Sequence, residues 1–267
     1  MRRFGGIPLD RPLVMGIVNV TPDSFSDGGD TFAHEDAIAR GLQQMKDGAD
    51  IIDVGGESTR PGAQPVSPEE EIRRIVPVVS ALAKAGAIVS IDTRHAAVMT
   101  EAVVAGARVI NDVSALHGDP ESMDVAARSG ADIVLMHMRG TPQTMRAHAN
   151  YMNVVEEVFA YLSARVAACE AAGIARTRLA IDPGFGFGKL ADDNERLLAG
   201  LNRFRALGCP IVVGLSRKFG KGKAPTERLA ESLAKAQEAV QRGADIVRVH
   251  DVSETVDMFG KIRTKTP

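Results

Sequence analysis

The chain is 267 residues long, with 34 acidic and 32 basic residues and a formal net charge of −2. This near balance excludes a protein that holds nucleic acid by bulk positive charge, and an aromatic content of 4% argues against stacking platforms for single strands. Two cysteines are too few for a disulfide framework or a zinc cage, and no apolar run approaches the ~20 residues of a membrane span. Because the N-terminus also lacks the pattern of a signal peptide, we expect a cytoplasmic globular protein that binds neither nucleic acid nor membrane.

Short apolar runs rich in β-branched residues recur along the chain, and this pattern is typical of strands covered on both faces in a parallel sheet. The runs predict strands at residues 14–18, 51–54, 88–91, 109–110, 133–136, 179–181, 211–213 and 246–249. Helical spacing between them is clearest at residues 37–45, 68–85, 154–172 and 227–240. Ser67, followed by Pro68 and three glutamates, marks the start of one of these helices.

A glycine recurs wherever an expected helix gives way to the next strand, as a left-handed residue at such a joint requires. These glycines are Gly48, Gly86, Gly106, Gly130, Gly173, Gly208 and Gly243. The mean spacing of ~32 residues suits one βα unit. Eight units predict an α/β fold, a single (β/α)8 TIM barrel over residues 1–267 with its core at about 13–260 and long loops after the first two strands. An open doubly wound sheet is the alternative.

Polar side chains end every expected strand, and α/β enzymes of either architecture form their sites at this end of the sheet. In chain order these residues are Asn19, Asp53, Asp92, Asn111, Asp112, His137, Asp182, Ser216, Arg217, Lys218, Arg248, His250 and Asp251. Asp92, Asn111 and Asp182 would converge from different strands and suit a planar heterocycle rich in hydrogen-bond donors. A metal held by these carboxylates is the alternative, although His137 adds little to such a cage. Lys218, Arg248 and His250 would supply cationic donors at the last two strands, where barrels often bind phosphate.

Other motifs do not predict a site. Residues 184–189 resemble a phosphate-binding P-loop superficially, but Pro183 replaces its first glycine and Leu190 its Ser/Thr. Cys169 and Cys209 lie away from the expected strand ends, so we interpret both as core residues. Four histidines have no partner at metal-ligand spacing and are assigned no role: His34, His95, His117 and His148.

Eight motifs in register over residues 13–257 resemble the dihydropteroate synthase family, the folate-pathway enzymes targeted by sulfonamides. They are Asn19–Phe25, Asp53–Gly62, Ser90–Thr93, Ile110–Val113, Met136–Met138, Asp182–Lys189, Gly214–Lys218 and Arg248–Val252. The resemblance implies a homodimeric transferase that uses Mg²⁺. It would condense 6-hydroxymethyl-7,8-dihydropterin diphosphate with p-aminobenzoate to 7,8-dihydropteroate and diphosphate, through early diphosphate loss and a pterin-methyl cation.

The same resemblance assigns roles to individual residues. The implied pterin ligands are Asp92, Asn111 and Asp182, with Met136 lining the slot and Arg248 stacked on the ring. Asn19 would be the Mg²⁺ ligand. Arg60 and His250 would contact the diphosphate, and the surroundings of the pterin edge and of p-aminobenzoate would be Thr59, Phe187, Ser216 and Lys218. The residues expected to act directly in catalysis are Asp92, Lys218, Arg60 and His250. Closure of the first two loops would exclude water.

One segment departs from the family pattern. Phe219 replaces a serine, and residues 219–226 form a shorter and more basic connection to the next helix than the family usually has. This difference predicts a more open and cationic p-aminobenzoate mouth. It also motivates one alternative, a catalytically silent homologue that binds pterin. A second alternative, a methyltetrahydrofolate-corrinoid methyltransferase, would share the acceptor set.

Overall fold

Eight parallel strands form the centre of the molecule. The structure is a computed structural model, and it describes residues 2–20, 29–58, 62–145, 147–216, 218 and 224–263. The strands are β3 (Leu13–Asn19), β4 (Ile51–Gly55), β5 (Val89–Asp92), β6 (Val109–Asp112), β7 (Asp132–Met136), β8 (Leu179–Asp182), β9 (Val212–Val213) and β10 (Ile246–Val249). They are ordered β8-β7-β6-β5-β4-β3-β10-β9, and a parallel bridge from Ile181 to Ile211 joins the two edges into a barrel. The predicted (β/α)8 fold is confirmed.

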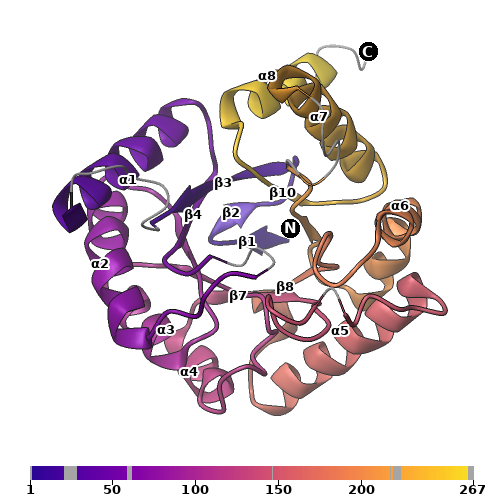
Figure 1. The fold of residues 1–267 in the computed structure, drawn as a ribbon, viewed down its shortest axis with the longest axis horizontal. Coiled ribbons are helices and arrows are strands. Elements are labelled where there is room, and N and C mark those ends of the chain that lie inside the picture. The colour runs from indigo at the N-terminus through magenta and orange to yellow at the C-terminus, as the bar shows by residue number, and fades with distance from the viewer. Residues whose placement is uncertain are drawn as a thin grey trace.

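The helices form a ring around this barrel (Figure 1). They are α1 (Gly29–Lys46), α2 (Pro68–Lys84), α3 (Ala96–Val104), α4 (Ser122–Ser129), α5 (Val154–Ala171), α6 (Ala191–Ala199), α7 (Pro225–Gln241) and α8 (Val252–Arg263), with short 3-10 turns η2 (Arg176–Arg178) and η3 (Leu201–Leu207). The four predicted helices are present, although α1 begins at Gly29 rather than at residue 37. Ser67 caps α2 by accepting a hydrogen bond from the Glu70 amide, as its sequence predicts. Among the described residues, no helix is long and apolar enough to cross a membrane.

The apolar core has two shells because successive strand residues face opposite sides of the sheet. Ile52 and Val54 of β4 belong to the large cluster between sheet and helices, together with Val78 of α2. Ile51 belongs to a smaller cluster inside the barrel. Asp53 shares the inward face with Ile51 and is fully buried. The interior is therefore apolar near the strand starts and polar near the strand ends.

The seven glycines between helices and strands all have positive φ, from 70° at Gly130 to 116° at Gly106. Three of them begin a Gly-Ala-Asp sequence, and each aspartate accepts a backbone hydrogen bond at the start of the barrel. Asp50 accepts from the Val14 amide at 2.9 Å, Asp132 from Gly5 at 2.6 Å and Asp245 from Ile211 at 2.9 Å. The repeat thus fixes both the turn and the alignment of neighbouring segments.

A hairpin at the N-terminus is absent from the sequence-based prediction. Strands β1 (Arg3–Phe4) and β2 (Ile7–Pro8) pair antiparallel and lie across the middle of the ring in Figure 1. Phe4 is fully buried in the interior cluster with Leu13 and Met15. The hairpin therefore closes the N-terminal end of the barrel. Two-residue strands are too short to show a periodic pattern, which is why the sequence did not reveal them.

Candidate active site

The predicted acceptors lie at the C-terminal ends of the strands that form the barrel. Asn19, Gly55, Asp92 and Asn111 are successive partners across β3, β4, β5 and β6. Met136 and Asp182 are partners across β7 and β8. Because paired residues of neighbouring strands lie side by side, the fold brings together side chains that are far apart in the chain.

Asp53 links Asn111 to Arg248. A single oxygen of its carboxylate, Oδ2, accepts from Arg248 Nε at 2.6 Å and from Asn111 Nδ2 at 3.1 Å. The other arm of the same guanidinium, Nη2, donates to Asp92 Oδ2 at 2.7 Å. Sequence reasoning placed Asp53 at a strand end but not in the site. The sequence does contain a signal for Asp53, because Asp53 and Asp92 are acidic residues at the ends of adjacent expected strands and Arg248 lies at the end of another.

Three buried polar atoms near the ends of β4 and β5 lack a hydrogen-bond partner among the described residues. They are Asp53 Oδ1, Asp92 Oδ1 and Ser90 Oγ. A buried polar group left unpaired costs roughly 1–3 kcal/mol, so native proteins keep few of them without a reason. Two carboxylate oxygens on adjacent strands are suited to accept hydrogen bonds from a ligand rich in N–H groups.

Burial sets the protonation behaviour of the site. It raises the pKa of Asp92 to about 7, although Arg248 opposes the shift and Asp53 adds to it. The pKa of Asp182 is also raised by burial, against the effect of Lys218. Burial lowers the pKa of Lys218 to about 8, with Asp182 opposing. Perturbed pKa values gathered at one end of a barrel are typical of a functional site.

The cationic side of the site follows β9 and β10. Lys218 Nζ donates to the Phe185 carbonyl at 2.6 Å and lies 4.4 Å from the centroid of the Phe187 ring. Ser216 Oγ lies 3.1 Å from Nδ1 of His250 and accepts from the His250 amide at 3.3 Å. Lys218 therefore contacts Phe187, and Ser216 contacts His250, while the roles predicted for these four residues stay predictions.

Some predicted residues lie outside the described part of the chain. These are Thr59, Arg60 and Arg217, together with residues 21–28 of the first loop and 219–223 of the shortened segment. The described flanks of the second loop are anchored: Glu57 pairs with Arg94 at 3.0 Å, and the Gly62 amide donates to the Pro142 carbonyl at 3.2 Å. Gly62 therefore lies against the connection that follows β7.

Other polar residues at strand ends stabilise the scaffold. Asp112 turns away from the site and accepts from the Ser114 and Leu116 amides at 2.6 and 2.9 Å. His95 pairs with the buried Glu71 at 2.7 Å. Both cysteines are free and buried, which confirms their interpretation as core residues.

Asn19 offers the chemistry that a Mg²⁺ ion would need. Its amide oxygen is a hard donor at the end of β3, in the same row as Asp92. Mg²⁺ usually keeps several waters and takes one or two protein oxygens with substrate phosphates. In the described residues no three His, Cys, Asp or Glu side chains form a metal-binding group. The position and chemistry of the Asn19 oxygen fit a Mg²⁺ ion that takes few protein ligands, and Mg²⁺ binding stays a prediction.

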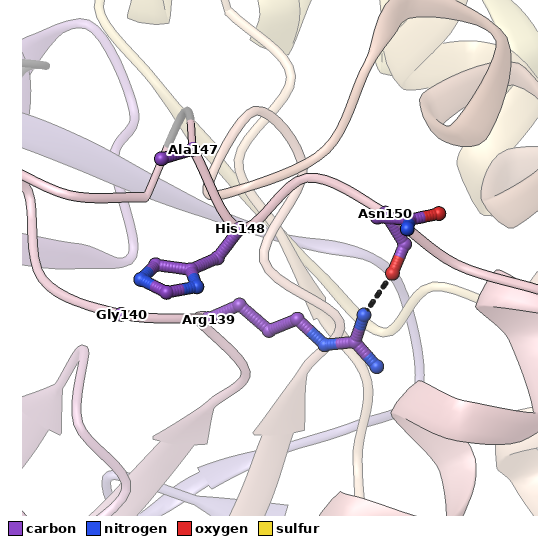
Figure 2. A pocket seen from close by; sticks show the side chains of 5 residues that line it. All are labelled: Arg139, Gly140, Ala147, His148 and Asn150. Carbon is purple, nitrogen blue, oxygen red and sulfur yellow. Dashed lines mark hydrogen bonds between the residues drawn. The ribbon is translucent and has the colours of Figure 1, made fainter.

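A concavity of about 460 Å³ lies in the connection between β7 and α5, apart from the predicted site. Figure 2 shows its lining residues, Arg139, Gly140, Ala147, His148 and Asn150. Arg139 donates to the Asn150 carbonyl and pairs with Glu157, and its guanidinium lies 3.9 Å from the centroid of the Tyr151 ring. Its cation is thus already engaged, and the predicted ligands lie elsewhere.

Comparison with known proteins identifies the family. Residues 15–250 match the family model described as pterin binding enzyme. The chain is 48% identical over 256 residues to dihydropteroate synthase from Escherichia coli K12. The matched segment covers 94% of this chain and 90% of that protein. The chain belongs to the dihydropteroate synthase family.

Solved structures of dihydropteroate synthases have the same fold. One from Xanthomonas albilineans with 4-aminobenzoic acid has a TM-score of 0.90 at 49% identity, over 97% of this chain and 95% of that one. One from Yersinia pestis in complex with a sulfonamide drug has a TM-score of 0.90 at 43% identity, with the same coverage. The resemblance inferred from eight motifs is confirmed, while the roles of single residues stay predictions.

Proposed function

We propose that this chain is a dihydropteroate synthase, which condenses 6-hydroxymethyl-7,8-dihydropterin diphosphate with p-aminobenzoate. The observation that carries the proposal is the pair of buried oxygens on Asp53 and Asp92 that have no partner among the described residues, at the strand ends where this family is expected to bind its pterin. A Xanthomonas albilineans relative in complex with 7,8-dihydropteroate, 46% identical over 98% of this chain, supports the same product.

The pterin would be held by the strand-borne acceptors. Asp92, Asn111 and Asp182 would accept from or donate to its ring edge, and the buried Met136 would line the slot. Arg248, held by Asp53 and Asp92, would lie over the ring face with its guanidinium plane fixed in advance. Such preorganisation reduces the conformational freedom that binding has to restrict.

The reaction would break the bond between the pterin methylene carbon and a diphosphate oxygen, with the electron pair leaving on the diphosphate. The arylamine nitrogen then attacks the pterin-methyl cation, and the new C–N bond forms as the nitrogen loses a proton. A carboxylate at Asp92 would stabilise the cation by a few kcal/mol at an effective dielectric constant of about 20. Arg60 and His250 would stabilise the charge that grows on the leaving group. Mg²⁺, held by Asn19 and diphosphate oxygens, would neutralise part of that charge.

The direct test measures diphosphate release by the purified chain. We expect release that requires both p-aminobenzoate and Mg²⁺ and that yields 7,8-dihydropteroate in equal amount. Pterin binding without release would instead identify a catalytically silent homologue. Methyl transfer from methyltetrahydrofolate to a corrinoid protein would identify the methyltransferase alternative.

Three further expectations accompany this proposal. A sulfonamide complex of the Yersinia pestis relative supports sulfonamide binding by this chain as well. The homodimeric state and the cytoplasmic location, inferred from the sequence, stay predictions.

A further inference from the structure

Lys189 is a buried lysine behind the site, with no role in the reaction described above. Its side chain is 8% exposed, and Nζ lies 2.9 Å from Nδ1 of His137. The same nitrogen donates to three carbonyls, at Gly184 (2.8 Å), Phe187 (3.1 Å) and His137 (3.3 Å). An ammonium group has three N–H donors, so these four neutral acceptors satisfy it completely.

His137 can act as an acceptor because it stays neutral. Burial lowers its pKa to about 2, and the charges of Lys189 and Arg139 act in the same direction. Tyr161 packs edge-on against the imidazole at 4.9 Å between ring centroids. The ring is thus held as a neutral partner of a lysine that faces the protein interior.

The contacts of Lys189 join the end of β7 to a tight turn. Gly184, Gly186 and Gly188 all have positive φ, between 62° and 80°. A Cβ on Gly184 would lie 1.9 Å from the His137 carbonyl oxygen, so the turn packs directly on the end of β7. Lys189 donates to the Gly184 and Phe187 carbonyls of this turn and to His137 at the end of β7. It therefore fixes the shape of the turn and its distance from the strand.

The opposite side of the same turn holds the substrate-facing residues. Its Phe185 carbonyl accepts from Lys218 Nζ at 2.6 Å, and its Phe187 ring lies under that ammonium group. Gly186 approaches the Lys218 chain so closely that a Cβ there would lie 3.1 Å from Cδ. A displacement of the turn would therefore move both Lys218 and Phe187.

We propose that Lys189 is a positioning residue, which acts through the turn at residues 184–188 to hold Lys218 and Phe187 in place for p-aminobenzoate. It does not touch substrate. The pterin acceptors Asp92 and Asn111 belong to β5 and β6, which Lys189 does not contact, whereas Asp182 accepts from the Gly184 amide of the turn at 2.7 Å. Two of the three pterin acceptors are therefore held independently of Lys189. The proposal rests on the proposed function and specifies how one substrate site of that function is built.

The test replaces Lys189 by methionine, which keeps the length of the chain and removes the charge and donors. We expect the KM for p-aminobenzoate to rise about tenfold or more, while the Kd for the pterin diphosphate stays within about threefold. The matched control is Lys235→Met on α7, where the lysine pairs with Glu195 at 2.6 Å away from the site. This control should change neither constant.

A double-mutant cycle with Lys218→Met separates positioning from general destabilisation. If Lys189 acts through Lys218, the double variant should have nearly the same KM as the worse single variant. Additive effects, or equal losses of p-aminobenzoate and pterin affinity, would overturn the proposal. If Lys189→Met does not fold, Lys189→Gln is measured in the same way, and failure of both to fold would show that the residue is only structural. Wild-type protein that releases no diphosphate would refute the proposed function, a result distinct from all of these.

Discussion

The two ends of the barrel use aspartates in opposite ways. At the N-terminal end, Asp50 and Asp245 each accept from a backbone amide and from an arginine, Arg11 or Arg2. At the C-terminal end, Asp53 and Asp92 share Arg248 but each keeps one buried oxygen without a partner among the described residues. The first pair is satisfied by the fold itself, whereas the second is left for a ligand.

This contrast separates stability from function. A carboxylate whose bonds are all made within the protein contributes to folding and has little left to offer a substrate. A buried carboxylate with an unpaired oxygen lowers stability in the free protein and gains on binding. Natural proteins tolerate such groups mainly at functional sites. Substitutions at the two ends should therefore have opposite signatures.

The largest effect is expected for Asp92→Asn. The amide keeps the shape but removes the charge that stabilises a cationic transition state, so kcat should fall roughly 10²- to 10³-fold, as when a single oxyanion-hole donor is removed. The melting temperature should not fall, because burial raises the pKa of this carboxyl and its ionised form therefore destabilises the fold. Steady-state kinetics and thermal unfolding of the same preparation check both statements. A variant that unfolds readily but keeps its turnover per folded molecule would place Asp92 among the structural residues.

Asp245→Asn at the other end should show the reverse. Its carboxylate accepts from the Ile211 amide at 2.9 Å and from Arg2 at 2.8 Å. Loss of these bonds should reduce the free energy of unfolding by roughly 1–3 kcal/mol. The kinetic constants should stay within about twofold of wild type. Urea unfolding with parallel assays measures the two quantities, and a large loss of kcat without a loss of stability would break the contrast.

Lys218→Ala should have a milder effect on the cationic side. It removes the ammonium group that the Phe185 carbonyl and the Phe187 ring hold in place, so substrate KM should rise about tenfold. We expect kcat to fall less than for Asp92→Asn, because a positively charged ammonium group cannot stabilise the pterin-methyl cation as the Asp92 carboxylate would. A loss of kcat as large as that of Asp92→Asn would assign it a direct part in the chemical step.

The smallest effect is a dependence of binding on pH. With the pKa of Asp92 at about 7, its ionised fraction rises about threefold between pH 6.5 and 7.5. Binding of the dihydropterin without its diphosphate should tighten by a similar factor, because the ionised carboxylate is the better acceptor. Arg248, Asp53, Glu71 and Asp112 are the charged groups that act on this carboxyl. Calorimetric titration should show the trend in wild type and none in Asp92→Asn.

Most of the fold follows from local pattern. The apolar runs gave all eight barrel strands, and the joint glycines, such as Gly106 with φ of 116°, gave the helix-to-strand turns. The β1–β2 hairpin was not predicted because it depends on a tertiary contact, the burial of Phe4 in the barrel interior. Such a contact leaves no local pattern in the sequence. The early start of α1 was missed because its first turn lacks an apolar stripe.

The site was predictable as a set of strand ends but not as a network. Asp92, Asn111 and Asp182 follow from position alone, since inward polar residues at strand ends converge in any parallel barrel. The roles of Asp53 and Lys189 depend on which atoms they contact. A single oxygen of Asp53 serves both Arg248 and Asn111, and Lys189 bonds to carbonyls that the sequence gives no means of locating.

The central claim is that the unpaired carboxylate oxygens at the C-terminal end bind the pterin. A crystal structure of the chain with the dihydropterin tests it most directly. We expect a ring nitrogen of the pterin to donate to Asp92 Oδ1 with an N–O distance of about 2.7–3.2 Å, while Arg248 stays bonded to Asp53. A pterin bound elsewhere, with Asp92 Oδ1 still unpaired, would contradict it.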